Sequence, residues 1–140
     1  MLDDRVEHSS LQGIAVGSRA AVLDSSVHDS KDFGIVAGSC AFIGNNDVTD
    51  SGKGGVLVGA ASTVIENRVV NSGAQGINTQ NNFDSLSIVS QNLVQTSGSA
   101  GLAVSCPAAV TFNSIGAHGT GQPFISTSGS GCAVIGNEPL

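Results

Sequence analysis

The chain has 140 residues, of which 19 are Gly and only 11% are charged, and its formal net charge is −6. Five Lys and Arg residues are too few to form the basic surface that binds nucleic acids or anionic membranes. No apolar run approaches the roughly 20 residues of a membrane span. We therefore predict one domain over residues 1–140, with no nucleic-acid partner and no membrane partner. That domain could be a segment of a longer chain.

The N-terminal stretch MLDDRVEHSS is acidic and polar, which is not typical of a signal peptide. The three cysteines, Cys40, Cys106 and Cys132, are odd in number and lack CxxC spacing. This pattern favours buried, reduced thiols over a disulfide framework or a metal site. The cysteines therefore predict a reducing, cytoplasmic location.

A repeat of about 21 residues begins near the first residue. Its clearest mark is a Gly before an aliphatic residue, and these Gly residues are spaced 21, 21, 21 and 25 apart: Gly13, Gly34, Gly55, Gly76 and Gly101. Nine residues before each lies a short polar residue, in a series that continues to Asn113: Asp4, Ser25, Asn46, Asn67, Asn92, Asn113. Two residues after each of these positions stands Val or Ile, and five residues after each stands a Ser in all coils but the last. At least five turns therefore align.

Each turn contains three short β-branched segments, for example residues 55–58, 63–65 and 68–70. Each segment is too short for a helix, and small or polar residues separate them. The chain lacks the Leu-x-x-Leu-x-Leu frame of a leucine-rich repeat and the six-residue sub-period of a left-handed β-helix. We predict an all-β, right-handed parallel β-helix with three parallel sheets and about 5–6 coils. The first coil enters at its third strand, around Val6, without a capping helix. Solenoid ends need caps, so either more chain or an oligomer would cover this end.

Two irregularities interrupt the frame. Four extra residues lie around NTQNNFDSL and three around STSGSG. Insertions in solenoids form loops on one face. For FDSLS, inside the first insertion, a plain loop is favoured over a ligand-binding lip.

The pattern V-x-x-N-x-V-x-x-S…G-I resembles the parallel β-helix repeat of the pectate-lyase-like superfamily over nearly the whole chain. The resemblance implies the fold but no particular substrate, because that superfamily includes lyases, epimerases, hydrolases, phage tailspikes and non-catalytic modules. Stacked coils would align the Asn residues into an amide ladder, at a corner whose sharp bend Asn tolerates. The Gly before each aliphatic residue would supply unusual dihedrals at another corner.

Strand alternation predicts which side chains point outward. On the first strand the outward column is nearly apolar, whereas the resemblance implies charged residues there in catalytic members. The second strand is also apolar outside. We therefore predict a homo-oligomer whose interface uses six residues: Val36, Leu57, Leu23, Phe42, Ile65 and Ile88.

Polar side chains gather at the end of the third strand, in a column of His8, Asp29, Asp50 and Asn71 beside Glu7 and His28. Aspartates one coil apart repel each other unless a cation or a shared proton lies between them. The candidate catalytic residues, acting as a general acid and base, are therefore His8, His28, Asp29 and Asp50. Asp29 and Asp50 are candidate ligands for calcium, the only cofactor that the sequence suggests.

The alternative is that these residues simply end the strand in water, where repulsion is weak. Two predicted neighbouring pairs of opposite charge support this alternative: Asp32 with Lys53, and Asp47 with Arg68. The sequence thus favours a non-catalytic β-helix scaffold or binding module that self-associates. The rivals are a small carbohydrate-active enzyme, such as a polysaccharide lyase or uronate epimerase, and a glycan-reading phage-type adhesin fragment; both would have a polysaccharide as partner.

Overall fold

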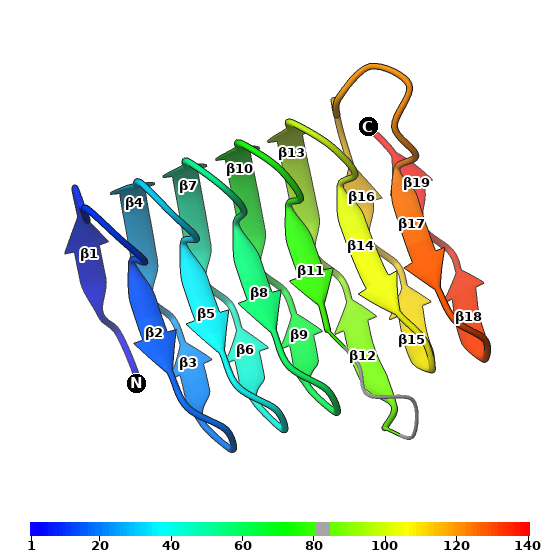
Figure 1. Ribbon diagram of the computed structural model, residues 1–140, viewed down its shortest axis with the longest axis horizontal. Helices are drawn as coiled ribbons and strands as arrows, with labels where there is room; N and C mark the ends of the chain where they lie inside the picture. The colour runs from blue at the N-terminus through cyan, green and yellow to red at the C-terminus, as the bar shows by residue number, and fades with distance from the viewer. Residues whose placement is uncertain (81–84) are drawn as a thin grey trace.

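The computed structural model describes residues 1–80 and 85–140. Every regular element in these residues is a short strand, and every strand pairing is parallel. The strands stack into a solenoid, with the two termini at opposite ends (Figure 1). The predicted right-handed parallel β-helix is confirmed. The described residues contain no helix that could cross a membrane.

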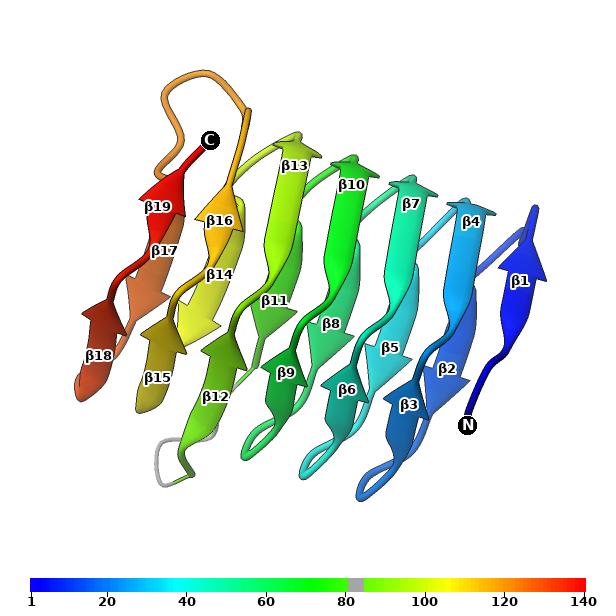
Figure 2. The same cartoon turned by 180° about the vertical axis from the view of Figure 1, so that it is seen from behind.

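Three sheets run along the solenoid, and we number them by strand order within a coil. Sheet I contains β2 (Ile14–Val16), β5 (Ile35–Ala37), β8 (Val56–Val58), β11 (Ile77–Thr79), β14 (Leu102–Ser105) and β17 (Ile125–Ser128). Sheet II contains β3 (Ala21–Leu23), β6 (Phe42–Gly44), β9 (Thr63–Ile65), β12 (Ser87–Ser90), β15 (Ala108–Thr111) and β18 (Cys132–Ile135). Sheet III contains β1 (Arg5–Glu7), β4 (Ser26–Ser30), β7 (Asp47–Ser51), β10 (Arg68–Ser72), β13 (Leu93–Ser97), β16 (Ser114–Ile115) and β19 (Glu138–Pro139). Sheets II and III face the viewer in Figure 2.

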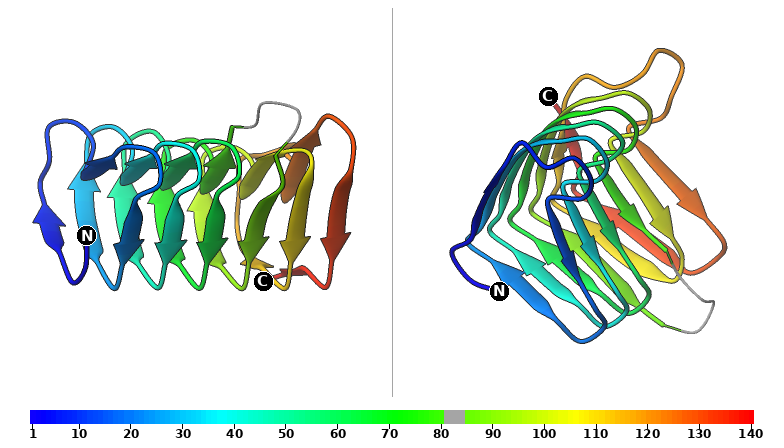
Figure 3. Two further views of the ribbon diagram at one scale, coloured as in Figure 1. Left: turned by 90° about the horizontal axis from the view of Figure 1, so that it is seen from below. Right: turned by 60° about the vertical axis from the view of Figure 1, so that its left-hand side comes forward.

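The register follows the sequence repeat. In sheet III, for example, Val48 pairs with Val69, which pairs with Val94. Each of these valines is at most 1% exposed, and matching columns in the other two sheets complete an aliphatic core. The oblique right-hand view in Figure 3 shows successive coils of similar outline one behind another. Among residues 1–80 and 85–140, each coil therefore pairs its strands with the coils before and after it, as in other solenoids.

The Asn ladder forms inside the corner between sheets II and III. The Asn67 carboxamide oxygen accepts the backbone N–H of Asn46 at 3.0 Å and the Asn46 amide at 2.9 Å. The Asn67 amide donates to the Ile43 and Ile65 carbonyls and to the Asn92 oxygen. The same pattern repeats up to Asn137. The ladder thus satisfies buried backbone groups at a corner where the strands cannot do so.

The backbone bend at this corner lies one residue before the ladder. Asp24, Asn45 and Glu66 have φ between 51° and 56°, and Asn46 and Asn67 are not among the residues with positive φ. The predicted conformational role of the ladder Asn is therefore wrong, because its amide bonds the neighbouring coils while its predecessor makes the bend.

The Gly column before sheet I also has a different cause from the predicted one. Gly13, Gly34 and Gly55 have no positive φ. A Cβ on Gly34 would overlap the Val48 methyl group and lie 2.8 Å from the Gly55 carbonyl oxygen. Gly is required here because the next coil approaches too closely for any side chain.

The irregular coils keep the register of their neighbours. The first insertion lies between β11 and β12, and its residues 81–84, which include part of FDSLS, are outside the described residues. In the last coil, Leu102 pairs with Ile125, which puts most of the extra length in the loop between β16 and β17. The prediction that the extra residues lie around STSGSG is therefore wrong for all but one of them. That one lies between Ser128 and Cys132, which are one residue further apart in sequence than their partners Ser105 and Ala108.

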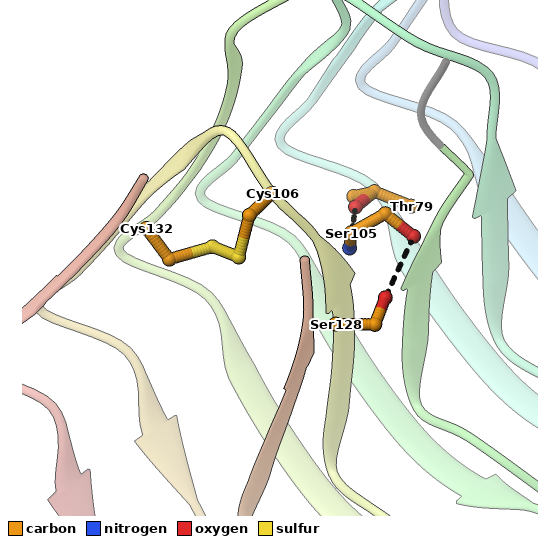
Figure 4. Close-up of a disulfide and its surroundings, with 5 residues drawn as sticks. All are labelled: Thr79, Ser105, Cys106, Ser128 and Cys132. Carbon is orange, nitrogen blue, oxygen red and sulfur yellow. Dashed lines mark hydrogen bonds between the residues drawn. A yellow bond between two sulfur atoms is a disulfide. The ribbon is translucent and has the colours of Figure 1, made fainter. Parts of the chain in front are cut away.

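The structure contradicts the prediction that the three cysteines are buried, reduced thiols. Cys106 and Cys132 form a disulfide that joins the last two coils where sheet I turns into sheet II (Figure 4). Beside it, the Ser105 backbone N–H donates to the Thr79 hydroxyl, and the Ser128 hydroxyl donates to that of Ser105. Cys40 is free but exposed. The disulfide points away from the cytoplasm, because such bonds persist mainly in oxidising compartments.

Candidate functional site

The candidate residues lie on and just after sheet III. His8, Asp29 and Asp50 occupy equivalent positions in successive coils, followed by Asn71 and Thr96, and all five have φ between 54° and 56°. Asn, Asp and His enter this left-handed region more readily than most residues. The polar composition of the column therefore has a conformational cause that is independent of any ligand.

The structure brings the four candidate residues into two His–Asp pairs. His28 Nδ1 lies 3.3 Å from the Asp50 carboxylate and 2.8 Å from the Thr49 hydroxyl. His8 Nε2 lies 3.8 Å from the Asp29 carboxylate. The two imidazole rings are 6.2 Å apart, edge to face. The residues are therefore neighbours, as the sequence suggested.

The aspartates are also held by other side chains. The Asn71 amide donates to Asp50 at 2.9 Å, and Lys31 Nζ lies 3.3 Å from Asp29. Within the described residues, no group of three or more His, Cys, Asp or Glu side chains could hold a metal ion. Asp29 and Asp50 could offer a cation one carboxylate each, which is fewer ligands than the six to eight oxygens that calcium prefers.

A shallow, open groove of about 450 Å³ runs beside the cluster, across four coils. Its walls come from equivalent positions, residues 29–31, 50–52, 71–73 and 96–98. The groove thus offers carboxylates, an amide, a hydroxyl and one cation, Lys31, at the spacing of the coils. An extended polar ligand could lie along it, contacting several coils at once.

The cluster remains in contact with water. The side chains of His28 and Asp50 are 45% and 44% exposed. Exposed ion pairs contribute little to stability, and general acid–base catalysis benefits from a site that excludes water. Nearby, a hydrogen bond from the Arg5 guanidinium and its charge lower the pKa of Glu7 below its ordinary value. The arrangement is that of a hydrated polar surface.

The outer faces of the three sheets differ in charge. The ion pairs predicted from the repeat are present, with Arg68 2.8 Å from Asp47 and Lys53 3.2 Å from Asp32. Both belong to sheet III or to the turn after it. In the described strands of sheets I and II, the outward positions hold no charged side chain.

The six residues predicted at an interface all point outward from these two sheets. Phe42 is 44% exposed and Ile88 38% exposed. The other four are half-buried by their neighbours in the stack: Leu23, Val36, Leu57 and Ile65. Phe112, which is 63% exposed at the corner after sheet II, was not predicted. Phe112 stands one residue before Asn113, a position that holds a polar residue in each earlier coil: Asp3, Asp24, Asn45, Glu66 and Gln91. This break in the column is the signal that could have identified it.

Comparison with known proteins identifies the fold but does not assign the chain to a family. No family model matches the chain, and no curated protein matches it. Among solved structures, the chain is similar to the periplasmic alginate epimerase AlgG, with a TM-score of 0.75 and 14% sequence identity. The match covers 99% of this chain and 39% of the epimerase chain. The chain is therefore a right-handed parallel β-helix, the fold that the pectate-lyase-like resemblance implies.

Proposed function

We propose that this chain is a non-catalytic β-helix module that assembles with further copies of itself through the outer faces of sheets I and II. The observation that carries the proposal is the segregation of charge: sheet III and its following turn hold the ion pairs, whereas the outward residues of the other two sheets are uncharged. Stacking at about 4.8 Å per coil turns single apolar residues into continuous stripes. Contiguous apolar surface of this kind marks interaction sites in soluble proteins.

Light scattering at tens of micromolar tests the proposal. We expect an oligomer that Leu57→Glu or Ile65→Glu dissociates while the β-type circular dichroism persists, because a carboxylate would then be buried in the interface. Val70→Glu is the matched control, since Val70 is a half-buried, outward residue of the same coil on sheet III. A monomeric wild-type protein would exclude the assembly, and loss of fold in both variants would place these side chains in the core.

A second candidate is a small carbohydrate-active enzyme or glycan-binding fragment that uses the groove after sheet III. The groove beside two His–Asp pairs favours it, and so does the fold shared with an alginate epimerase. Incubation with uronate polymers, followed by ultraviolet detection of unsaturated ends and by NMR of the product, tests for lyase and epimerase chemistry. We expect activity, if this candidate is correct, to disappear in His28→Ala and Asp50→Asn.

Calcium at Asp29 and Asp50 would belong to this second candidate. Calorimetric titration should then show binding that the double substitution Asp29→Asn and Asp50→Asn removes. Binding that survives these substitutions would contradict the assignment.

The disulfide also bears on the setting in which the module works. We infer an oxidising compartment, because Cys106 and Cys132 are paired and because the alginate epimerase with a similar fold is a periplasmic protein.

A further inference from the structure

The outer face of sheet I carries a single row of side chains. In β5, β8 and β11 the central residue points outward, and the residues on either side of it are buried. Glycines stand two positions before and two positions after both Val36 and Leu57, so no side chain rises beside them along the strand. The parallel register aligns the outward residues into one ridge along the solenoid: Ala15, Val36, Leu57, Asn78 and Ala103.

The outer face of sheet II has the opposite relief. In β9 the outward residues are Thr63 and Ile65, and Val64 between them is fully buried. These outward positions are two residues apart on each strand, which separates them by about 6.6 Å. The register extends them into two rows, one of Ala21, Phe42, Thr63, Ile88 and Ala109, the other of Leu23, Gly44, Ile65, Ser90 and Thr111. A trough therefore runs between the two rows.

The trough is open over only part of its length. In β6 the Phe42 ring leans across it and lies 2.8 Å from the position of a Cβ on Gly44. Over β9, β12 and β15 the residues on its floor, Val64, Val89 and Val110, are fully buried beneath the backbone. Neither the ridge nor the two rows include a charged side chain. The two faces are therefore complementary in shape and free of charge repulsion.

The two faces lie on opposite sides of the solenoid. Sheet I faces the viewer in Figure 1, and sheet II faces the viewer in the reversed view of Figure 2. Each face has six described strands of three or four residues, which cover about 330 Å². A stable pair buries about 800 Å² on each partner, so contact through one face alone would be weak. A copy that is held on both faces buries twice as much.

We propose that copies of this chain stack side by side, with the sheet I ridge of one copy seated in the sheet II trough of the next. This pairing rests on the self-association proposed above and specifies which face meets which. Two ridges in contact would hold the backbones apart, and two sheet II faces could seat only one row of each in the trough of the other. A ridge in a trough allows the spacing of about 10 Å that packed sheets adopt. Contact between unlike faces is heterologous, so the stack can add further copies.

One substitution on each face tests this pairing. Leu57→Glu puts a carboxylate on the ridge, and Ile65→Glu puts one beside the trough. Every contact between unlike faces needs one intact ridge and one intact trough, so each variant alone should be monomeric. An equal mixture should form one-to-one pairs, because the Ile65→Glu protein supplies the ridge and the Leu57→Glu protein supplies the trough.

Nuclear magnetic resonance detects such a pair even when it is weak. Unlabelled Leu57→Glu protein added to isotope-labelled Ile65→Glu protein should shift the amide signals of sheet I and leave those of sheet II in place. When the label is exchanged between the two proteins, the shifts should move to sheet II. The matched control adds unlabelled Ile65→Glu protein to the labelled form of the same variant, and no signal should shift.

The outcomes separate this pairing from the self-association itself. A monomeric wild-type protein would overturn both. If the wild-type protein assembles and either variant alone still assembles, like faces meet, and only the pairing of unlike faces is wrong. Absence of shifts in the mixture would also overturn the pairing. Circular dichroism checks that each variant keeps its β structure, and Val36→Glu on the same ridge replaces Leu57→Glu if that variant does not fold.

Discussion

Gly55→Ala is expected to destabilise the protein by about 3 kcal/mol, near the upper end of the range for overpacked cores. The new Cβ would overlap the Val69 Cγ1 methyl group and lie 2.6 Å from the Gly76 carbonyl oxygen. The methyl group could move by a rotamer change, but the carbonyl belongs to the backbone of the next coil, which the sheet I ladder fixes. Urea denaturation followed by circular dichroism measures the loss.

Gly17→Ala is the matched control for this substitution. Nothing lies within 4 Å of a Cβ at Gly17, which also has no positive φ. We expect a change of no more than about 0.5 kcal/mol there, as at most surface sites. Equal effects at Gly17 and Gly55 would show that a local backbone preference for Gly, and not contact between coils, selects Gly at these positions.

Asn67→Ala is expected to cost about 3 kcal/mol, because buried groups on both neighbouring coils lose their partners. The Asn46 backbone N–H and amide lose their acceptor, and the Ile43 carbonyl loses a donor. Asn67 is 1% exposed, so water cannot replace these bonds without opening the stack. The midpoint and slope of urea unfolding check this value.

Two further substitutions locate the effect in the ladder. Asn137→Ala should cost less, because no coil follows Asn137 in the described structure and its bonds to Asn113 are only partly buried. Asn67→Asp keeps the acceptor but replaces the donating amide with a carboxylate, so it should be at least as harmful as Asn67→Ala near neutral pH. If Asn67→Ala and Asn137→Ala both proved harmless, the ladder would be dispensable.

The fold was predictable because the repeat shows itself in single residues. Asn67, Val69 and Gly76 recur at fixed offsets, and each marks a contact that every coil must make. The pairing of Asp47 with Arg68 followed from the same alignment and is present. The reason why position 55 requires Gly was not predictable from the sequence. The groups that a side chain there would overlap, the Val69 methyl group and the Gly76 carbonyl, are distant in sequence and meet Gly55 only in the folded stack.

The site was predictable only as a set of neighbours. Alignment of the repeats put His28 and Asp50 in neighbouring columns. It did not predict the hydrogen bond between His28 and Thr49. The groove could not be predicted, because its walls include the backbone of Gly52 and Gly73, and a repeat pattern does not report surface curvature. The disulfide was missed because Cys106 and Cys132 are 26 residues apart, outside the usual period, and only the lengthened last coil brings them together.

The constant register of the central coils has a consequence at the level of the gene. Between Ser26 and Ser72, every paired residue of sheet III has its partner 21 positions away, and the Asn ladder and Gly column keep the same interval. Deletion or tandem duplication of 63 coding nucleotides here, about one coil, would leave every rejoined strand facing a chemically equivalent neighbour. Unequal recombination within this region would therefore yield shorter or longer folded descendants, so the length of the solenoid can evolve in whole coils.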